Sequence, residues 1–108
     1  MQTMYIAAAP ERAAIDASRG PLLLEFGTNW CGHCMASQAA LAQAYAGHAG
    51  VPHHKVEDGP GRALGRAFRV KLWPTLIFLR DGQEVARLVR PLDPQAIADA
   101  FARIESAD

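Results

Sequence analysis

The two cysteines of this chain lie between a stretch that favours a buried strand and a stretch that favours a helix. Leu22-Leu23-Leu24-Glu25-Phe26 is an almost continuous apolar run, typical of a central strand buried on both faces of an α/β sheet. Cys31 and Cys34 follow soon after it, in Trp30-Cys31-Gly32-His33-Cys34, and an alanine-rich helical pattern then continues to about residue 48. The cysteines therefore fall at a strand-to-helix turn, where two thiols can close a disulfide across one helical turn.

The rest of the chain alternates between predicted strands and helices. We predict strands over about residues 4–8, 51–57, 75–79 and 84–89, and helices over about residues 10–19, 60–68 and 94–105. Asp81-Gly82 separates the last two strands and favours a tight hairpin, because the central residues of such a turn need positive φ. The order β-α-β-α-β-α-β-β-α predicts one α/β domain over residues 1–108, with a parallel core and an antiparallel edge.

Charge and apolar patterning argue against several classes of function. The chain has 11 Lys and Arg against 11 Asp and Glu, so nothing favours a nucleic-acid or anionic-membrane surface. No apolar run approaches the roughly 20 residues that a membrane-spanning helix needs. Residues 1–10 lack the basic region and the apolar stretch of a signal peptide. We therefore expect a cytoplasmic monomer, although a mature domain whose leader was removed would have the same sequence.

A Cys-x-x-Cys pair has four ordinary explanations. A zinc site usually needs four ligands; a second cysteine pair is missing, and the histidines do not supply a matching spacing. Covalent haem attachment needs His directly after the second cysteine, where this chain has Met35. A chance pair of buried structural cysteines is disfavoured by the flanking Trp and Gly. Dithiol redox chemistry fits best, and it requires neither a metal nor a dissociable cofactor.

The position of the pair on the predicted helix supports redox chemistry. Cys31 would lie at the helix N-terminus, where unpaired N–H groups and the helix dipole stabilise a thiolate. Cys34 could then attack the mixed disulfide that Cys31 forms and release the product. Gly32 permits close approach of a partner backbone. His33 can add positive charge beside Cys31 and lower its pKa, or it is a surface residue with no such role.

Four groups of residues make the chain resemble the thioredoxin-fold family over essentially its whole length. They are Glu25-Phe26, Trp30-Cys31-Gly32-His33-Cys34, Trp73-Pro74-Thr75 and Asp81-Gly82. The resemblance implies a central mixed β-sheet flanked by helices on both faces. It also implies that Pro74 follows a cis peptide bond and lies against the cysteine pair, in a substrate groove bordered by Trp30, Trp73 and Thr75.

The resemblance also suggests a role for Glu25. The family commonly places a buried carboxylate, usually Asp, at this position below the second cysteine. A carboxylate in an apolar strand would have a raised pKa, and Glu25 would accept the proton of Cys34 through water. Lys55 falls where family members carry a lysine near this carboxylate, so we expect a Glu25–Lys55 pair. The alternative is that Glu25 faces solvent on an edge strand.

Three departures from the family pattern bear on redox direction and partner choice. Gly-His stands between the cysteines, as in protein disulfide isomerase domains, where thioredoxins proper have Gly-Pro. The reference potentials, about −270 mV for thioredoxin and about −180 mV for the isomerase, then suggest a less reducing couple. Trp73 replaces a smaller aliphatic residue, and Arg90 with Pro91 replaces a Gly-containing turn beside the groove.

The resemblance implies an enzyme that exchanges disulfides with protein substrates. Cys31 would be the nucleophile, Cys34 the resolving thiol and Glu25 the proton acceptor. We expect a reductant that an unidentified reductase recharges. Two alternatives stay open: a disulfide oxidase or isomerase in an oxidising compartment, and a partner-binding module with little redox turnover.

Overall fold

The structure is a computed structural model that describes residues 4–105. Residues 1–3, part of the stretch without signal-peptide features, and residues 106–108 lie outside the described residues, so the single domain over 1–108 stays a prediction. The helices are α1 (Arg12–Asp16), α2 (Gly32–Tyr45), α3 (Ala63–Ala67) and α4 (Pro94–Glu105). The strands are β1 (Pro21–Gly27), β2 (His53–Glu57), β3 (Thr75–Arg80) and β4 (Gln83–Val89).

The four strands form one mixed sheet in the order β2-β1-β3-β4. β1 pairs with β2 in parallel, and it pairs with β3 antiparallel, as β3 does with β4. The predicted mixed sheet is confirmed, but the expectation of a parallel core is wrong for β3. The connection through α3, residues 58–74, returns the chain to the end of the sheet at which β2 finishes, where Gly27 is the register partner of Glu57 and Phe26 that of Thr75. β3 therefore starts where β2 ends and runs against β1.

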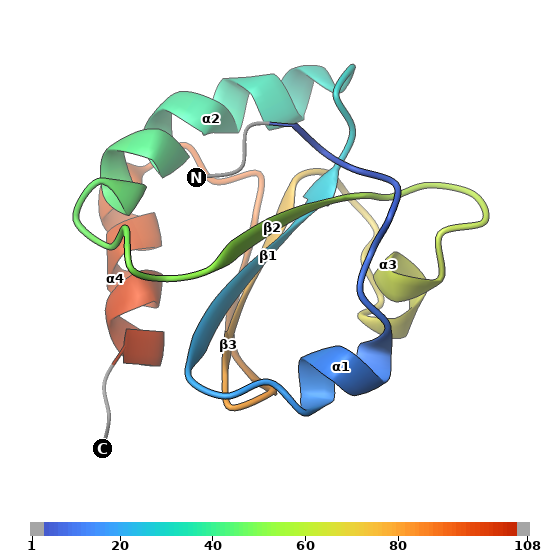
Figure 1. Cartoon of the computed structure of the whole chain (residues 1–108). Helices are drawn as coiled ribbons and strands as arrows, with labels where there is room; N and C mark the ends of the chain where they lie inside the picture. The colour runs from blue at the N-terminus through green and yellow to red at the C-terminus, as the bar shows by residue number, and fades with distance from the viewer. Residues whose placement is uncertain (1–3, 106–108) are drawn as a thin grey trace.

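The strand predicted over residues 4–8 is reduced to a single bridge between Ile6 and Val56. Ile6 N–H donates to Lys55 O at 3.1 Å, and Glu57 N–H donates to Ile6 O at 2.9 Å. The segment therefore crosses the edge of β2 at one point and does not extend the sheet. In Figure 1 it is the dark blue chain that runs from the N-terminus toward α1.

Helices cover both faces of the sheet (Figure 1), as the resemblance implies. α2 and α4 pack on one face, with Leu41 and Phe101 buried there. α1 and α3 lie on the other face, with Ile15 and Leu64 buried against it. Side chains alternate along β1, so that Leu22, Leu24 and Phe26 face α1 and α3 while Leu23 faces the α2 side. The same alternation directs Glu25 toward α2.

The helices differ from their predicted bounds mainly in length. α1 and α3 have five residues each, shorter than the predicted 10–19 and 60–68, whereas α4 has the predicted bounds. At the hairpin, Asp81 and Gly82 have φ of 51° and 78°, which confirms the predicted turn. Among the residues that the structure describes, no helix combines the length and the apolar character that crossing a membrane requires.

Candidate active site

The two cysteines occupy the first turn of α2. Cys31 is the N-cap residue, and its Sγ accepts the backbone N–H of Cys34 at 3.2 Å. Both are free thiols, with 8% of Cys31 and 1% of Cys34 exposed. Cys31 therefore lies at the rim of the site, while Cys34 lies beneath it.

The cis peptide bond between Trp73 and Pro74 lies beside Cys31, as the resemblance implies. Cys31 Sγ is 4.0 Å from Trp73 O. Arg90 holds this segment from the other side, because its Nε donates to Trp73 O at 2.8 Å and its N–H donates to Pro74 O at 2.9 Å. Thr75 begins β3 and is buried, with its hydroxyl donating to Leu72 O at 2.6 Å. Trp73 thus adjoins the thiol through its carbonyl, and Arg90 lies one hydrogen bond further away.

Two tryptophans form the apolar part of the rim. Trp30 is 76% exposed, and its ring meets that of Trp73 edge-on, with centroids 5.8 Å apart. Trp73 Nε1 donates to Asp58 Oδ2 at 2.8 Å, which fixes the orientation of the indole. Gly32 and His33 are exposed at the start of α2, and a Cβ at Gly32 would meet nothing within 4 Å. The surface around Cys31 is therefore open to an approaching backbone.

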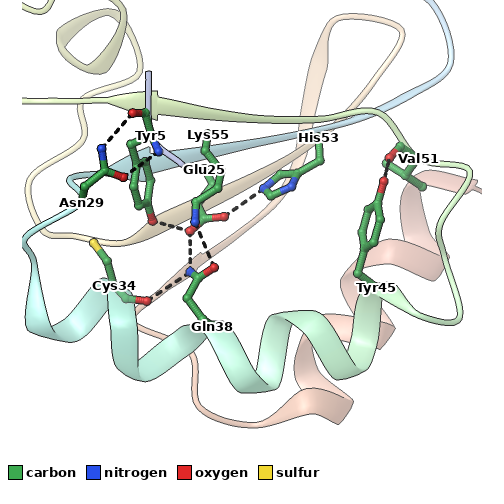
Figure 2. Close-up of polar contacts among 9 residues, drawn as sticks. All are labelled: Tyr5, Glu25, Asn29, Cys34, Gln38, Tyr45, Val51, His53 and Lys55. Atoms are coloured by element: carbon green, nitrogen blue, oxygen red, sulfur yellow. Dashed lines mark hydrogen bonds and ion pairs between the residues drawn. The ribbon is translucent and has the colours of Figure 1, made fainter. Parts of the chain in front are cut away.

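Glu25 lies at the centre of a buried polar network below Cys34 (Figure 2). Its Oε1 accepts His53 Nε2–H at 2.9 Å. Its Oε2 accepts the hydroxyl of Tyr5, and also Gln38 Nε2–H at 3.0 Å. Lys55 Nζ donates to the other end of the Gln38 amide at 2.9 Å. Glu25 is completely buried, so the alternative of a solvent-facing residue on an edge strand is wrong.

The hydrogen bonds to Glu25 reverse the pKa shift expected from its burial. Burial raises the pKa of Glu25, but hydrogen bonds from His53 and Tyr5 and the positive charge of Lys55 outweigh burial and lower this pKa below its ordinary value. The expected raised pKa is therefore wrong. Lys55 is the register partner of Glu25 in the β1–β2 pair, so the expected proximity is present. Gln38 is hydrogen-bonded to both residues and links them.

His53 approaches Glu25 through one ring nitrogen only. Its Nε2 lies 2.9 Å from Glu25 Oε1, and the contact is buried on both sides. Among the described residues, the other ring nitrogen, Nδ1, is buried and has no hydrogen-bond partner. The imidazole is therefore held in place by Glu25.

Tyr5 and Cys34 share a space that exists because residue 27 has no side chain. A Cβ at Gly27 would lie 2.5 Å from Cys34 Sγ and 2.8 Å from both Cζ and the hydroxyl oxygen of Tyr5. Tyr5, Cys31 and Cys34 pack together as one buried cluster. Burial, followed by the hydrogen bond with Cys31, raises the pKa of Cys34 to about 11. Cys34 is therefore a protonated thiol at neutral pH in the reduced protein.

The sequence analysis missed three members of the network: Tyr5, Gln38 and His53. Two of them follow from simple spacing, because Gln38 is one helical turn after Cys34 and His53 shares a strand face with Lys55. Tyr5 has no such signal, since it lies in a segment outside any regular strand. No group of three His, Cys, Asp or Glu within residues 4–105 could hold a metal ion.

Comparison with known proteins agrees with this geometry. The family model described as Thioredoxin matches residues 3–103. The structure of reduced thioredoxin 2 from Pseudomonas aeruginosa PAO1 is 55% identical, with 97% of each chain covered and a TM-score of 0.86. Thioredoxin of Haemophilus influenzae is 30% identical over 101 residues, which are 91% of this chain and 92% of that protein.

The chain belongs to the thioredoxin family of thiol–disulfide oxidoreductases, and Cys31 and Cys34 form a Cys-x-x-Cys site consistent with that family. Similar sequences also occur inside much longer proteins. A peptide-N(4)-(N-acetyl-beta-glucosaminyl)asparagine amidase of Caenorhabditis elegans is 32% identical over 84 residues, which are 78% of this chain but 14% of the amidase. The chain thus spans about a seventh of that relative's length.

Proposed function

We propose that this chain reduces disulfides in protein substrates through its Cys-Gly-His-Cys dithiol. The observation that carries the proposal is the position of Cys31 Sγ, at the N-cap of α2 and 4.0 Å from the carbonyl that precedes the cis proline. The exposed ring of Trp30 and open space around Gly32 leave room for a polypeptide beside this sulfur.

The first step is attack by the Cys31 thiolate on one sulfur of the substrate disulfide. A bond forms between Cys31 Sγ and that sulfur, and the other substrate sulfur leaves as a thiolate that takes a proton from water. The backbone N–H of Cys34 donates to Cys31 Sγ at 3.2 Å and stabilises negative charge there. His33, exposed beside it, is proposed to add positive charge at the same place.

The second step is attack by Cys34 on Cys31 Sγ, which forms the intramolecular disulfide and releases the remaining substrate thiolate. Two causes of the raised pKa of Cys34, its hydrogen bond with Cys31 and the charge of Cys31, disappear once Cys31 is in the mixed disulfide. The pKa of Cys34 therefore falls when this thiol must ionise. Glu25 is the proposed acceptor of the proton; its lowered pKa keeps it ionised but also makes it a weak base, so it would hold the proton only briefly.

An insulin-reduction assay with dithiothreitol as electron donor tests this function. We expect turnover by the wild-type chain and its loss in Cys31→Ser, which keeps the size of the side chain but not the nucleophile. Cys34→Ser should trap the mixed disulfide with the substrate, which mass spectrometry detects. Turnover no faster than dithiothreitol alone, unchanged by Cys31→Ser, would contradict an enzyme and favour the partner-binding module.

The direction of electron flow depends on the reduction potential. Gly-His between the cysteines favours a potential above the roughly −270 mV of thioredoxin and toward the roughly −180 mV of protein disulfide isomerase. Equilibration against glutathione redox buffers measures this potential. A value close to that of thioredoxin would refute a tuning role for His33. A value at or above that of the isomerase would favour the disulfide oxidase or isomerase over the reductant.

Partners and location follow from the proposed direction. A reductant needs an electron donor, and we propose a separate reductase that reduces the disulfide between Cys31 and Cys34. It would act in a compartment that keeps thiols reduced, which agrees with the proposed cytoplasmic location. Trp73 and Arg90 border the thiol and are proposed to set partner choice. We propose that the chain acts as a monomer, which sedimentation at several concentrations tests.

A further inference from the structure

We propose that Tyr5 is a proton-relay residue, whose hydroxyl passes the proton of Cys34 to Glu25 in place of a water molecule. The inference rests on the proposed function, because it concerns the step in which Cys34 resolves the mixed disulfide. Tyr5 lies in the N-terminal segment, outside all regular elements, and 5% of it is exposed.

The hydroxyl of Tyr5 lies between the two groups that exchange the proton. It donates to Glu25 Oε2, and the Tyr5 side chain packs against Cys34 in the buried cluster that both form with Cys31. Figure 2 shows the Tyr5 ring descending between β2 and α2, with its oxygen joined to Glu25 and the sulfur of Cys34 close by. Cys34 Sγ and the Tyr5 oxygen both adjoin the point where a Cβ at Gly27 would stand, at 2.5 Å and 2.8 Å. The phenol therefore lies beside the thiol and in direct contact with the carboxylate.

The backbone of Tyr5 is held in place by a side chain from the active-site loop. Asn29 Oδ1 accepts the N–H of Tyr5 at 2.8 Å, and Asn29 Nδ2 donates to the carbonyl of Tyr5 at 3.0 Å. The next residue, Ile6, is bonded to β2 through both its N–H and its carbonyl. Lys55 Nζ lies 4.4 Å from the centre of the Tyr5 ring, in a cation–π contact. These contacts fix the hydroxyl without placing it in a strand.

The relay moves two protons and leaves no phenolate. Cys34 S–H gives its proton to the Tyr5 oxygen while the Tyr5 O–H proton moves to Glu25 Oε2. The Cys34 thiolate then attacks Cys31 Sγ, and the substrate sulfur leaves with the electron pair of the broken S–S bond and takes a proton from solvent. Tyr5 ends with a new O–H bond directed at the thiolate. Burial and the neighbouring carboxylate raise the pKa of Tyr5, which favours concerted transfer because the phenol cannot lose a proton before it gains one.

Other charged groups facing Cys34 are consistent with this path. Cys31 contacts it from the start of α2, and Glu25 approaches from β1 through Tyr5. Lys55 and His53 reach Glu25 from β2 and keep it ionised before the transfer. In the reduced protein, proton transfer from Cys34 to Glu25 is unfavourable, because the pKa of Cys34 is raised. In the mixed disulfide Cys31 is no longer a thiol, so its contribution to this raised pKa is lost and the transfer becomes easier.

A stopped-flow reaction with the aromatic disulfide 5,5′-dithiobis(2-nitrobenzoate) separates the two steps. Attack by Cys31 releases one coloured thiolate, and resolution by Cys34 releases a second one. We expect Tyr5→Phe to slow the second release about 100-fold, the lower end of the usual contribution of a positioned proton-transfer group, and to change the first release by less than about twofold. The slowed phase should depend on pH differently from the wild type.

Tyr45→Phe is the matched control. Tyr45 also loses a buried hydrogen bond, from its hydroxyl to Val51 O at 2.6 Å, but it does not contact Cys34 or Glu25 through that hydroxyl (Figure 2). Both releases should stay at wild-type rates in this variant. Equal slowing of both releases in Tyr5→Phe, or a second release within about twofold of wild type, would overturn the relay.

A measurement that keeps the tyrosine keeps the test valid if Tyr5→Phe fails to fold. The chain has two tyrosines, so incorporation of 3,5-difluorotyrosine into Tyr45→Phe makes only the phenol of residue 5 more acidic. The relay predicts a changed rate of the second release alone, and an unchanged second release contradicts it. The assay with the aromatic disulfide tests the relay, and insulin reduction tests the proposed function. If the chain shows the relay with the aromatic disulfide but does not reduce insulin, the relay stands and the proposal that it reduces protein substrates is wrong.

Discussion

Gly27→Ala tests the close packing on which the resolving cysteine depends. Gly27 is the last residue of β1, and its φ does not lie in the left-handed region, so alanine introduces no backbone strain. The new Cβ would nevertheless stand 2.5 Å from Cys34 Sγ and 2.8 Å from the Tyr5 ring, where ordinary contact begins at 3.4 Å. Both side chains must therefore move away from β1.

The cost follows from two opposing effects. Overfilling a packed interior costs about 1–3 kcal/mol, and alanine in a strand regains about 0.5–1 kcal/mol relative to glycine. We expect the free energy of unfolding to fall by about 1–2 kcal/mol, since neither Tyr5, held by Asn29, nor Cys34, held on α2, can shift freely. The displaced sulfur should also resolve mixed disulfides more slowly.

Urea unfolding followed by circular dichroism measures the free energy, and Gly50→Ala is the control. A Cβ at Gly50 would meet nothing within 4 Å, so this variant should be neutral or about 0.4–1 kcal/mol more stable. With a slope of about 1.5 kcal/mol/M, the two midpoints should differ by about 0.7–2 M. Equal midpoints would refute the packing argument. If Gly27→Ala is less stable but still resolves mixed disulfides at the wild-type rate, the packing argument holds and the predicted slowing of resolution is wrong.

Four further predictions concern the network and the rim. Because the pKa of Glu25 is lowered in the folded protein, ionised Glu25 stabilises the fold at pH values above its unfolded-state pKa of about 4.3. This stability is lost as pH falls through the folded-state pKa, so the difference in unfolding free energy between wild type and Glu25→Gln should shrink in acid. A difference that does not change with pH would contradict the lowered pKa. At neutral pH, iodoacetamide should modify Cys31 and spare Cys34, whose pKa is about 11, as peptide mass spectrometry checks; equal modification would be inconsistent with the burial of Cys34. Asn29→Ala removes both hydrogen bonds to the backbone of Tyr5 and should slow the second thiolate release by less than Tyr5→Phe does. A larger effect than that of Tyr5→Phe would indicate that Asn29 itself takes part in the proton transfer from Cys34. Trp73→Phe loses the hydrogen bond to Asp58 and should raise KM for insulin several-fold with little change for the small aromatic disulfide, and a matching change for both would argue against a role in protein binding.

Much of the fold could be predicted from the pattern of the sequence. The apolar run at residues 22–26 lies in the central strand β1, the Asp81-Gly82 pair makes the hairpin, and Pro94 opens α4. These features depend on local backbone preferences and on burial of one strand, which neighbouring residues determine. The direction of β3 was predicted wrongly, because an apolar run shows that a strand is buried but not which way it runs beside its neighbour.

The chemistry of the site divides in the same way. The sequence by itself determined the dithiol and its place at the start of a helix, because these are set by residue type and spacing along the chain. That Glu25 and Pro74 adjoin the dithiol was implied by the resemblance to the thioredoxin-fold family, and the structure agrees. Only the tertiary structure decided the charge state of Glu25, since His53, Tyr5 and Gln38 reach it from three separate segments. A buried carboxylate alone would have a raised pKa, and the hydrogen bonds that reverse this shift exist only after the chain has folded.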